Sequence, residues 1–522
     1  MRLIIDKKYL LIPVSTGASK KVILFYHGNE VVYELSARID LLSPEYFFPV
    51  DMHIFQNMVL DVSCIPDMQL TLAMVNTKPE LPATADRYRP FWHFTAKYGW
   101  INDPNGLVYI EGNYHMFYQH NPVGTEWGNM HWGHAISPDL FHWQEQGIAL
   151  YPDRMGNMFS GSAIIDKENK SGLSENGVPA VLLYYTTAGN TSKISENMSF
   201  AQCIAYSTDG GKNFKKYKNN PVISHIEAYN RDPKVIFSPE LNKYVMVLFI
   251  DEHKYYIFVS DNLLQWEKLQ EVILPEDSEC PDFFPLAVDG RITNIKWVFC
   301  GASDYYLVGS MKNGMFVVEQ EPKRLFHGKV SYAAQTFSNV PDGRRIRISW
   351  NKVGTANFVF NGQMGIPCDL SLIEDEGEYL ICANPVREIV SIYENTHIEK
   401  NFSILPEKPF KFALKHKAYD INFTILDTQQ EDFTLSLFGQ VIHYSKEKSQ
   451  IIYMDNYFPA KIRKGDFTLR MIIDKLSFEL FIDSGSIAIC CSCICDYNIS
   501  ILELSAKEEI CIDSLSISEL GS

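Results

Sequence analysis

Short strand-like runs recur along almost the whole chain, and they limit its fold more than any other feature. Val22–Tyr26, Val181–Tyr185, Tyr244–Ile250 and Tyr255–Val259 are examples. Each run is rich in β-branched and aromatic residues, is bounded by turn-forming residues, and is too short for a typical helix. Helical periodicity is scarce elsewhere. The chain is therefore predicted to be all-β over nearly its whole length.

A faint internal repeat indicates how the strands of the middle region are arranged. Ser137–Trp143 resembles Ser260–Trp266, and Ser207–Phe214 is a looser third copy. Each copy has a Ser, then an Asp or Asn region that favours a tight turn, and then an aromatic residue that can pack into the next strand. Such repeats on an all-β background suggest the blades of a propeller, although three unrelated hairpin turns would give the same pattern.

Two breaks in composition divide the chain into three predicted units. Thr77–Asp86 is polar and Pro-rich, which is typical of a linker, and a second break lies within Ile373–Thr396. Repeated strand patterns after the second break favour a β-sandwich. The predicted units are an N-terminal accessory β domain, a catalytic propeller domain and a C-terminal β-sandwich, at residues 1–86, 87–375 and 395–522.

The charge balance narrows the class of partner. The 522 residues include 63 acidic and 47 basic side chains, which gives a formal charge of −16. A nucleic acid or an anionic membrane surface would be repelled on average, whereas a neutral ligand is unaffected by net charge. The aromatic content of 13% suits sites that stack flat faces against sugar rings. We therefore expect a small neutral ligand, with no nucleic-acid or membrane partner.

The N-terminal residues and the cysteines bear on location and on metal binding. Charges interrupt Met1–Lys8 at once, so we expect a soluble, cytoplasmic protein unless a signal has been removed. The cluster Cys490–Cys495 lacks a second ligand pair at zinc-binding spacing and is expected to be a reduced strand. His131 and His134 lack a carboxylate at fitting spacing and are expected to be structural or sugar-facing. We therefore predict no metal and no cofactor.

Two carboxylates stand out because the adjoining residues restrict their backbone. Asp103 precedes a proline, which holds it extended, and Asn105–Gly106 is predicted to turn the chain sharply. Asp232 follows Arg231, which is expected to keep the Asp232 carboxylate ionised. Taken alone, the Asp103 stretch fits an ordinary turn better than a functional site, and the Asp232 stretch also fits a solvated ion pair on a loop.

A third carboxylate, Glu279, lies in an acidic stretch followed by apolar residues. Nearby like charges and burial raise a carboxyl pKa, as a general acid working near neutral pH requires. Glu276 and Asp277, in the same stretch, are expected to lie on an acidic surface loop. Together with Asp103 and Asp232, Glu279 suits retaining glycoside hydrolysis, which needs a nucleophile and an acid/base carboxyl about 5 Å apart.

The stretches around these carboxylates resemble the motifs of glycoside hydrolase family 32, the β-fructosidases. That family includes invertases, inulinases, levanases and sucrose-6-phosphate hydrolases. Weaker similarity continues through Leu469–Gly485. Eight motifs occur in the family's order: His93–Gly106, Tyr118–Pro122, Trp127–His134, Phe159–Ser162, Asn230–Pro233, Glu279–Asp282, Tyr332–Phe337 and Gly343–Trp350.

The resemblance implies a five-bladed β-propeller followed by a β-sandwich, with the N-terminal β domain as an extra unit. It implies that Asp103 is the nucleophile, that Glu279 is the acid/base, and that Asp232 binds fructose hydroxyls and stabilises the transition state. The residues implied to bind the substrate are Asn102, Gln119, Trp127, Phe159, Ser160, Arg231, Tyr332 and Trp350.

The same resemblance suggests the class of substrate, and this chain also departs from the family pattern at one position. Trp127–His134 and Tyr206–Gly211 look more like exo-acting fructanases than sucrose-6-phosphate hydrolases. We therefore expect a retaining exo-acting β-fructofuranosidase for sucrose or short fructo-oligosaccharides. A fructosyltransferase and a non-catalytic fructan-binding protein stay open as alternatives, and the oligomeric state stays unknown. Ser278 stands where the family often has a Trp, which bears on the leaving-group side.

Overall fold

The computed structural model describes residues 1–81, 86–354, 359–426, 431–463 and 465–521, and it confirms the all-β prediction. Within those residues the helical structure consists of two short 3-10 helices, η1 (His53–Phe55) and η2 (Arg387–Ile392). No helix in the described ranges is long and apolar enough to cross a membrane. Part of the predicted linker, residues 82–85, lies outside the described residues.

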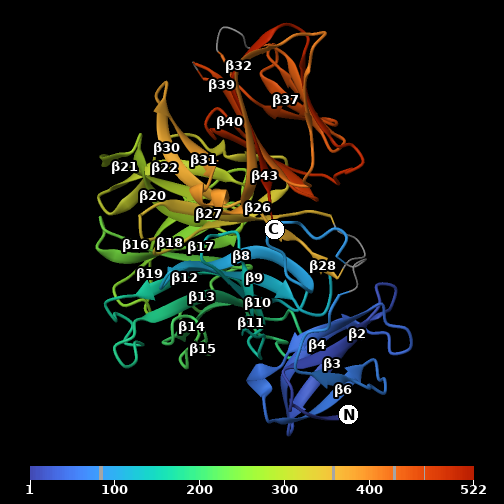
Figure 1. Cartoon of the computed structure of the whole chain (residues 1–522). Helices are drawn as coiled ribbons and strands as arrows, with labels where there is room; N and C mark the ends of the chain where they lie inside the picture. The colour runs from blue at the N-terminus through green and yellow to red at the C-terminus, as the bar shows by residue number, and fades with distance from the viewer. Residues whose placement is uncertain (82–85, 355–358, 427–430, 464, 522) are drawn as a thin grey trace.

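Two small sheets form the N-terminal part, drawn in dark blue in Figure 1. Their strand orders are β1-β6-β3-β4 and β5-β2-β7. Every second side chain of β6 is buried, as expected for a strand with one face on a core. The strands are β1 (Arg2–Ile4), β2 (Tyr9–Val14), β3 (Lys20–His27), β4 (Glu30–Arg38), β5 (Tyr46–Asp51), β6 (Val59–Ile65) and β7 (Ala73–Val75).

The middle of the chain begins with three antiparallel sheets, ordered β11-β10-β9-β8-β28, β12-β13-β14-β15 and β16-β17-β18-β19. Their strands are β8 (Gly99–Ile110), β9 (Asn113–Asn121), β10 (His131–Ser137), β11 (Gln144–Leu150), β12 (Asn157–Asp166), β13 (Ala180–Ala188), β14 (Ala201–Ser207), β15 (Lys215–Lys216), β16 (Arg231–Ser238), β17 (Lys243–Asp251), β18 (Lys254–Ser260), β19 (Glu267–Ile273) and β28 (Phe360–Asn361).

A ten-stranded sheet completes the middle region, with β23-β22-β21-β20-β30-β27-β26 as its main path. Its strands are β20 (Asp282–Val288), β21 (Arg291–Cys300), β22 (Tyr305–Lys312), β23 (Met315–Val318), β24 (Lys323–Arg324), β26 (Ser331–Thr336), β27 (Arg345–Asn351), β29 (Gln363–Met364), β30 (Cys368–Asp375) and β31 (Glu378–Pro385). The first strands of the three preceding sheets and two strands of the ten-stranded sheet contact one another in a closed order, β8, β12, β16, β20, β26 and back to β8.

The internal repeat seen in the sequence marks the same turn in three successive sheets. Ser137, Ser207 and Ser260 end β10, β14 and β18, the third strands of their sheets. Each serine is buried, and its hydroxyl donates to the Asp or Asn two residues later, at 3.2, 2.7 and 3.3 Å. The three copies are therefore equivalent structural units rather than unrelated turns.

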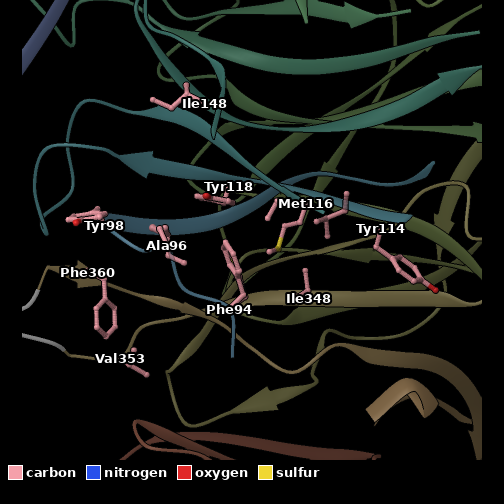
Figure 2. Close-up of a cluster of buried hydrophobic side chains, with 14 of the residues drawn as sticks. Phe94, Ala96, Tyr98, Tyr114, Met116, Tyr118, Ile148, Ile348, Val353 and Phe360 are labelled. Carbon is pink, nitrogen blue, oxygen red and sulfur yellow. The ribbon is translucent and has the colours of Figure 1, made fainter. Parts of the chain in front are cut away.

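One continuous hydrophobic core joins the N-terminal sheets to the middle region. Figure 2 shows part of it, where Phe94 lies among side chains that include Met116 and Ile348. The ring of Phe94 is 5.2 Å from that of Tyr118. This packing fixes the segment that leads into β8, the strand that carries Asp103.

The two histidines of the Trp127–His134 motif are structural. His131 is fully buried, and its Nε2 is 2.7 Å from the hydroxyl of Tyr33 in β4, so it ties the N-terminal sheets to β10. His134 is buried against the ring of Phe117 at 4.2 Å. Burial lowers the pKa of His131 to about 3, so its ring is neutral under ordinary conditions.

Two C-terminal sheets share one separate core and lie at the far end of the molecule from the N-terminal sheets (Figure 1). Cys490 and Cys491 are buried, unpaired residues of β41, whereas Cys493 and Cys495, also buried and unpaired, follow the end of that strand. The strands are β25 (Phe326–His327), β32 (Tyr393–Ile404), β33 (Phe410–Ala413), β34 (Tyr419–Ile425), β35 (Phe433–Leu437), β36 (Gln440–Ser445), β37 (Gln450–Tyr453), β38 (Asn456–Pro459), β39 (Phe467–Ile473), β40 (Ser477–Ile482), β41 (Ile487–Ser492), β42 (Ile501–Ala506) and β43 (Ile510–Leu520).

A buried charged group joins the C-terminal sheets to the middle region. His93 Nδ1 is 3.1 Å from Asp474 Oδ2, and His93 Nε2 is 3.2 Å from Glu479 Oε1. Burial alone lowers the pKa of His93, but the charge of Glu479 and the hydrogen bonds to both carboxylates outweigh it and raise that pKa to about 9. His93 is therefore protonated at neutral pH and bridges two buried carboxylates.

The protonated His93 should stabilise the fold most below pH 6.5 and lose that contribution as the pH rises through about 9, since its pKa is raised on folding. We expect His93→Gln to lower the free energy of unfolding by about 2 kcal/mol at pH 6. The difference between the variant and the wild type should shrink by pH 9.5. Urea unfolding at both pH values measures this, and an equal difference at both would show that His93 is not charged.

Candidate active site

The eleven residues singled out in the sequence lie together around one cavity of about 420 Å³. They come from β8, β9, β12, β16, β26, β27 and the loops beside them, so the closed order of strand contacts brings distant parts of the sequence together. What each residue does chemically stays a prediction. The cavity is lined by Asn102, Asp103, Gln119, Trp127, Phe159, Ser160, Phe200, Tyr229, Arg231, Asp232, Glu279, Tyr332 and Trp350.

Asp103 lies within β8, where one hydroxyl donor and one amide donor orient its carboxylate. Ser160 Oγ donates to Asp103 Oδ2 at 2.6 Å, and Asn102 Nδ2 donates to Asp103 Oδ1 at 3.0 Å. The sharp turn predicted at Asn105–Gly106 is wrong, because β8 continues to Ile110. Register shifts in its pairing with β9 and a φ of +54° at Gly106 show that the chain forms β-bulges there instead.

Asp232 is the most deeply buried carboxylate of the cavity, with 4% of its surface exposed. Its φ of +66° is rare for a non-glycine residue, and such strain persists where neighbouring contacts fix it. The backbone N–H of Asp232 donates to Thr186 Oγ1 at 3.0 Å, and that of Cys280 donates to Asp232 Oδ2 at 3.0 Å. The side chain is thus held facing Glu279 and its neighbours.

Arg231 favours the ionised form of Asp232, as predicted, but burial outweighs its effect. Burial raises the pKa of Asp232 to about 7, and Arg231 offsets this only in part because Asp103 and Glu279 add like charge. Arg231 instead makes its short contact with Glu279, where Nη2 donates to Oε1 at 2.6 Å, whereas its Nε is 3.7 Å from Asp232. The guanidinium of Arg231 therefore contacts Glu279 more closely than it contacts Asp232.

Glu279 is partly exposed, with 34% of its side chain accessible, and it is held from two sides. Besides the contact from Arg231, the hydroxyl of Tyr332 donates to Glu279 Oε2 at 2.7 Å. The carboxyl thus has two fixed donors, stays partly exposed and lines the cavity. A carboxyl so placed can exchange a proton with a ligand in the cavity.

The surface position predicted for Asp277 is wrong, since only 3% of this residue is exposed. Its carboxylate accepts backbone N–H groups of Ser278, Ser303 and Tyr305 at 2.8 to 3.0 Å. Burial raises the pKa of Asp277 to about 6, although these hydrogen bonds act in the opposite direction. Asp277 fastens the loop that carries Glu279 to the turn before β22.

Four residues near the carboxylates were not predicted from the sequence. Phe200 and Tyr229 line the cavity, and the thiol of Cys280 contacts Asp103 at 3.4 Å and Asp232 at 3.5 Å. The ammonium of Lys352 lies 3.2 Å from the centre of the Tyr332 ring. Cys280 lies inside the motif Glu279–Asp282, so its place next to Glu279 is the signal that could have predicted it.

Two buried donors in the cavity wall have no partner among the residues that the structure describes. They are Gln119 Nε2 and Trp350 Nε1. A buried donor without an acceptor is costly, and both side chains line the cavity. Hydroxyl groups of a bound sugar would satisfy them. Over the described ranges, no group of three or more His, Cys, Asp and Glu residues could hold a metal ion.

Asp232→Asn should make the fold more stable at alkaline pH, because the raised pKa means that ionising Asp232 destabilises the folded state. That contribution to stability is complete below about pH 4 and is lost as the pH rises through 7. We expect the variant to exceed the wild type by about 1–3 kcal/mol at pH 8 and by less at pH 5. Urea unfolding at both pH values measures this, with exposed Asp251→Asn as the control. An equal gap at both would contradict it.

Comparison with known proteins agrees with this arrangement. The family described as "Glycosyl hydrolases family 32 N-terminal domain" matches residues 93–384. A levanase of Bacillus subtilis is 32% identical, over 88% of this chain and 75% of its own length. An invertase of Schizosaccharomyces pombe is 37% identical over 50% of this chain and 48% of its own length.

Solved structures agree as well. An exo-inulinase from Aspergillus awamori has a TM-score of 0.73 and 26% identity, covering 83% of this chain and 98% of its own. A fructofuranosidase from Schwanniomyces occidentalis, complexed with fructose, has the same TM-score and identity, with 84% and 99% covered. The fold and the site therefore define a glycoside hydrolase. The chain belongs to glycoside hydrolase family 32.

Proposed function

We propose that the protein is a retaining, exo-acting β-fructofuranosidase that removes terminal β-D-fructosyl residues from sucrose or short fructo-oligosaccharides. The observation that carries the proposal is the meeting of Asp103, Asp232 and Glu279 in one cavity, each held by separate donors. Relatives named levanase, exo-inulinase, invertase and fructan β-fructosidase support the substrate class. A cavity of about 420 Å³ suits a small ligand.

Each carboxylate has a separate role in this proposal. Asp103 attacks the anomeric carbon of the fructosyl unit while Glu279 donates a proton to the departing glycosidic oxygen. The resulting fructosyl ester on Asp103 is then hydrolysed by water, from which Glu279 takes a proton. Two displacements at the same carbon retain its configuration.

Asp232 and the remaining wall bind the sugar. We propose that Asp232 accepts or shares hydrogen bonds with fructose hydroxyls and stabilises the positive charge that develops in the transition state. Gln119 and Trp350 supply the two donors that have no partner in the described part of the chain. Trp127 and Phe159, whose rings are 5.8 Å apart, give the bound substrate apolar faces.

We further propose that the middle region is a five-bladed β-propeller at residues 87–375, followed by a β-sandwich at 395–522 and preceded by an accessory β domain at 1–86. The closed order of contacts from β8 through β26 supports five blades. The equivalent Ser-containing turns of three successive sheets support it too. A propeller places inner strands around one axis, where residues from several blades meet.

Product analysis with sucrose, inulin and levan, run side by side, tests the proposed function. We expect free fructose from the start of each reaction that proceeds, with sucrose and short oligosaccharides preferred to polymer. Early release of oligosaccharides from the polymers would argue against exo action. Longer oligosaccharides made from sucrose at high concentration would identify a fructosyltransferase. If no substrate gives any product, the remaining interpretation is a non-catalytic fructan-binding protein.

A further inference from the structure

A second cavity, of about 480 Å³, lies between the N-terminal sheets and the loop that follows β9. Its N-terminal wall comes from β3, β4 and β5, including Lys20, Arg38 and Tyr46. The opposite wall is residues 121–129 and part of the segment that joins β13 to β14. Trp127 lines this cavity and also lines the active-site cavity. The two cavities therefore share a wall.

A line of aromatic rings runs along the active-site cavity to this shared wall. Tyr229 is 5.5 Å from Phe200, Phe200 is 5.6 Å from Phe159, and Phe159 is 5.8 Å from Trp127, all edge to face. The Tyr229 end is fixed beside the acid/base group, since Arg231 donates both to the Tyr229 carbonyl and to Glu279. The other end is Trp127, which is 52% exposed.

The chemistry of the second cavity suits a neutral, hydroxyl-rich ligand. Its charged lining consists of two cations and two anions, Lys20, Arg38, Glu34 and Glu126, although the chain as a whole carries −16. Glu126 is 3.2 Å from Lys20 and 3.0 Å from Arg38, and these side chains are 38 to 48% exposed. Balanced, accessible donors and acceptors beside aromatic rings can bind sugar hydroxyls and sugar faces.

We infer that this cavity binds the remote sugar units of a β-fructan oligosaccharide whose terminal fructosyl unit occupies the active site. The inference rests on the proposed function. In that reaction the leaving group departs from beside Glu279, so a longer leaving group continues along the ring line to Trp127 and reaches the N-terminal sheets. The N-terminal sheets then select for chain length without taking part in bond cleavage.

Neighbouring residues on single strands provide matched variants. Tyr46 lines the second cavity, whereas adjacent Phe47 is exposed and does not. Lys20 lines it, whereas adjacent Lys21 does not. Successive side chains of a strand point to opposite faces, so the two residues of each pair differ mainly in whether the side chain reaches the second cavity. Tyr46→Ala and Lys20→Ala are the test variants, and Phe47→Ala and Lys21→Ala are their controls.

The experiment measures kcat/KM of the full chain for sucrose, for fructosylnystose and for a levan-type oligosaccharide. Tyr46→Ala and Lys20→Ala should lower kcat/KM about five- to tenfold for at least one of the two longer substrates, mainly through KM. Sucrose hydrolysis should be unchanged in all four variants, and the controls should resemble the wild type throughout. Titration of the Asp103→Ala variant with the same sugars should show that the affected longer substrate binds more tightly than sucrose. Adding Lys20→Ala to this variant should remove that difference in affinity.

Each outcome separates this inference from the proposed function. Wild-type protein that cleaves none of the sugars refutes the proposed function itself. Sucrose cleavage with the same ratio of long to short substrate in test and control variants overturns only the second site. Because Tyr46 also packs against the core, thermal unfolding accompanies each assay. If Tyr46→Ala does not fold, the pair of Lys20, which is exposed, and Lys21, which is half-buried, decides the result alone.

Discussion

Asp103→Ala should abolish the release of fructose from every substrate, with a loss of at least about 10⁵-fold in kcat. Without the carboxylate no fructosyl ester can form, so a substrate with a good leaving group gains nothing from its reactivity. The loss concerns chemistry rather than folding, because the donors to Asp103, Ser160 and Asn102, lie at the cavity and can be solvated. Steady-state kinetics on sucrose and on an aryl fructoside measure it.

Two controls accompany the Asp103 variant. Asp103→Asn keeps the size of the side chain and its hydrogen-bond acceptor, and should be as inactive as Asp103→Ala. Both variants should still bind sucrose, since the other wall residues are intact. Rescue of Asp103→Ala by azide with retained configuration would show that the nucleophile is another residue.

Glu279→Ala should lower sucrose hydrolysis by about 10²–10⁴-fold, because the departing oxygen loses its proton donor. An aryl fructoside, whose leaving group needs that proton less, should lose far less in its first step. The fructosyl ester should then accumulate, since water also lacks its base. Azide needs no general base and should speed the breakdown of the trapped ester. Pre-steady-state kinetics on both substrates, with and without azide, measure these effects.

The matched control for this variant addresses the partners of Glu279. Arg231 and Tyr332 donate to different oxygens of the wild-type carboxylate. Glu279→Gln keeps an oxygen that accepts from Arg231, and its amide N–H can donate to the Tyr332 hydroxyl, which accepts as well as donates. It should therefore hold the loop in place and still show the same dependence on the leaving group. If the losses on sucrose and on the aryl fructoside are equal in both variants, Glu279 is not the acid.

The sequence was sufficient for the fold class and for eleven of the thirteen residues that line the cavity. Alternating and apolar runs report strands directly, because each strand has one or two faces on a core. The motif residues could be named because they lie in short, contiguous stretches such as Asn102–Asp103 and Arg231–Asp232. Each stretch reaches the cavity as a unit on one strand or loop.

Local signals failed where distant contacts decide. Asp277 looks like part of an acidic loop, but its partners Ser303 and Tyr305 are 26 and 28 residues away. Gly106 gives the same signal in a turn and in a bulge, because both use a positive φ. Arg231 pairs with Glu279, 48 residues along the chain, rather than with its neighbour. None of these partners is visible in a single stretch of sequence.

The central claim is that Asp103 becomes covalently linked to the fructosyl unit during a retaining reaction. Glu279→Ala, mixed with an activated aryl fructoside and digested after quenching, should give one peptide whose mass has increased by one fructosyl unit, and fragmentation should locate that unit on Asp103. The fructose first released by the wild type should keep the β configuration. An adduct on another residue, or no adduct together with an inverted product, would contradict the account.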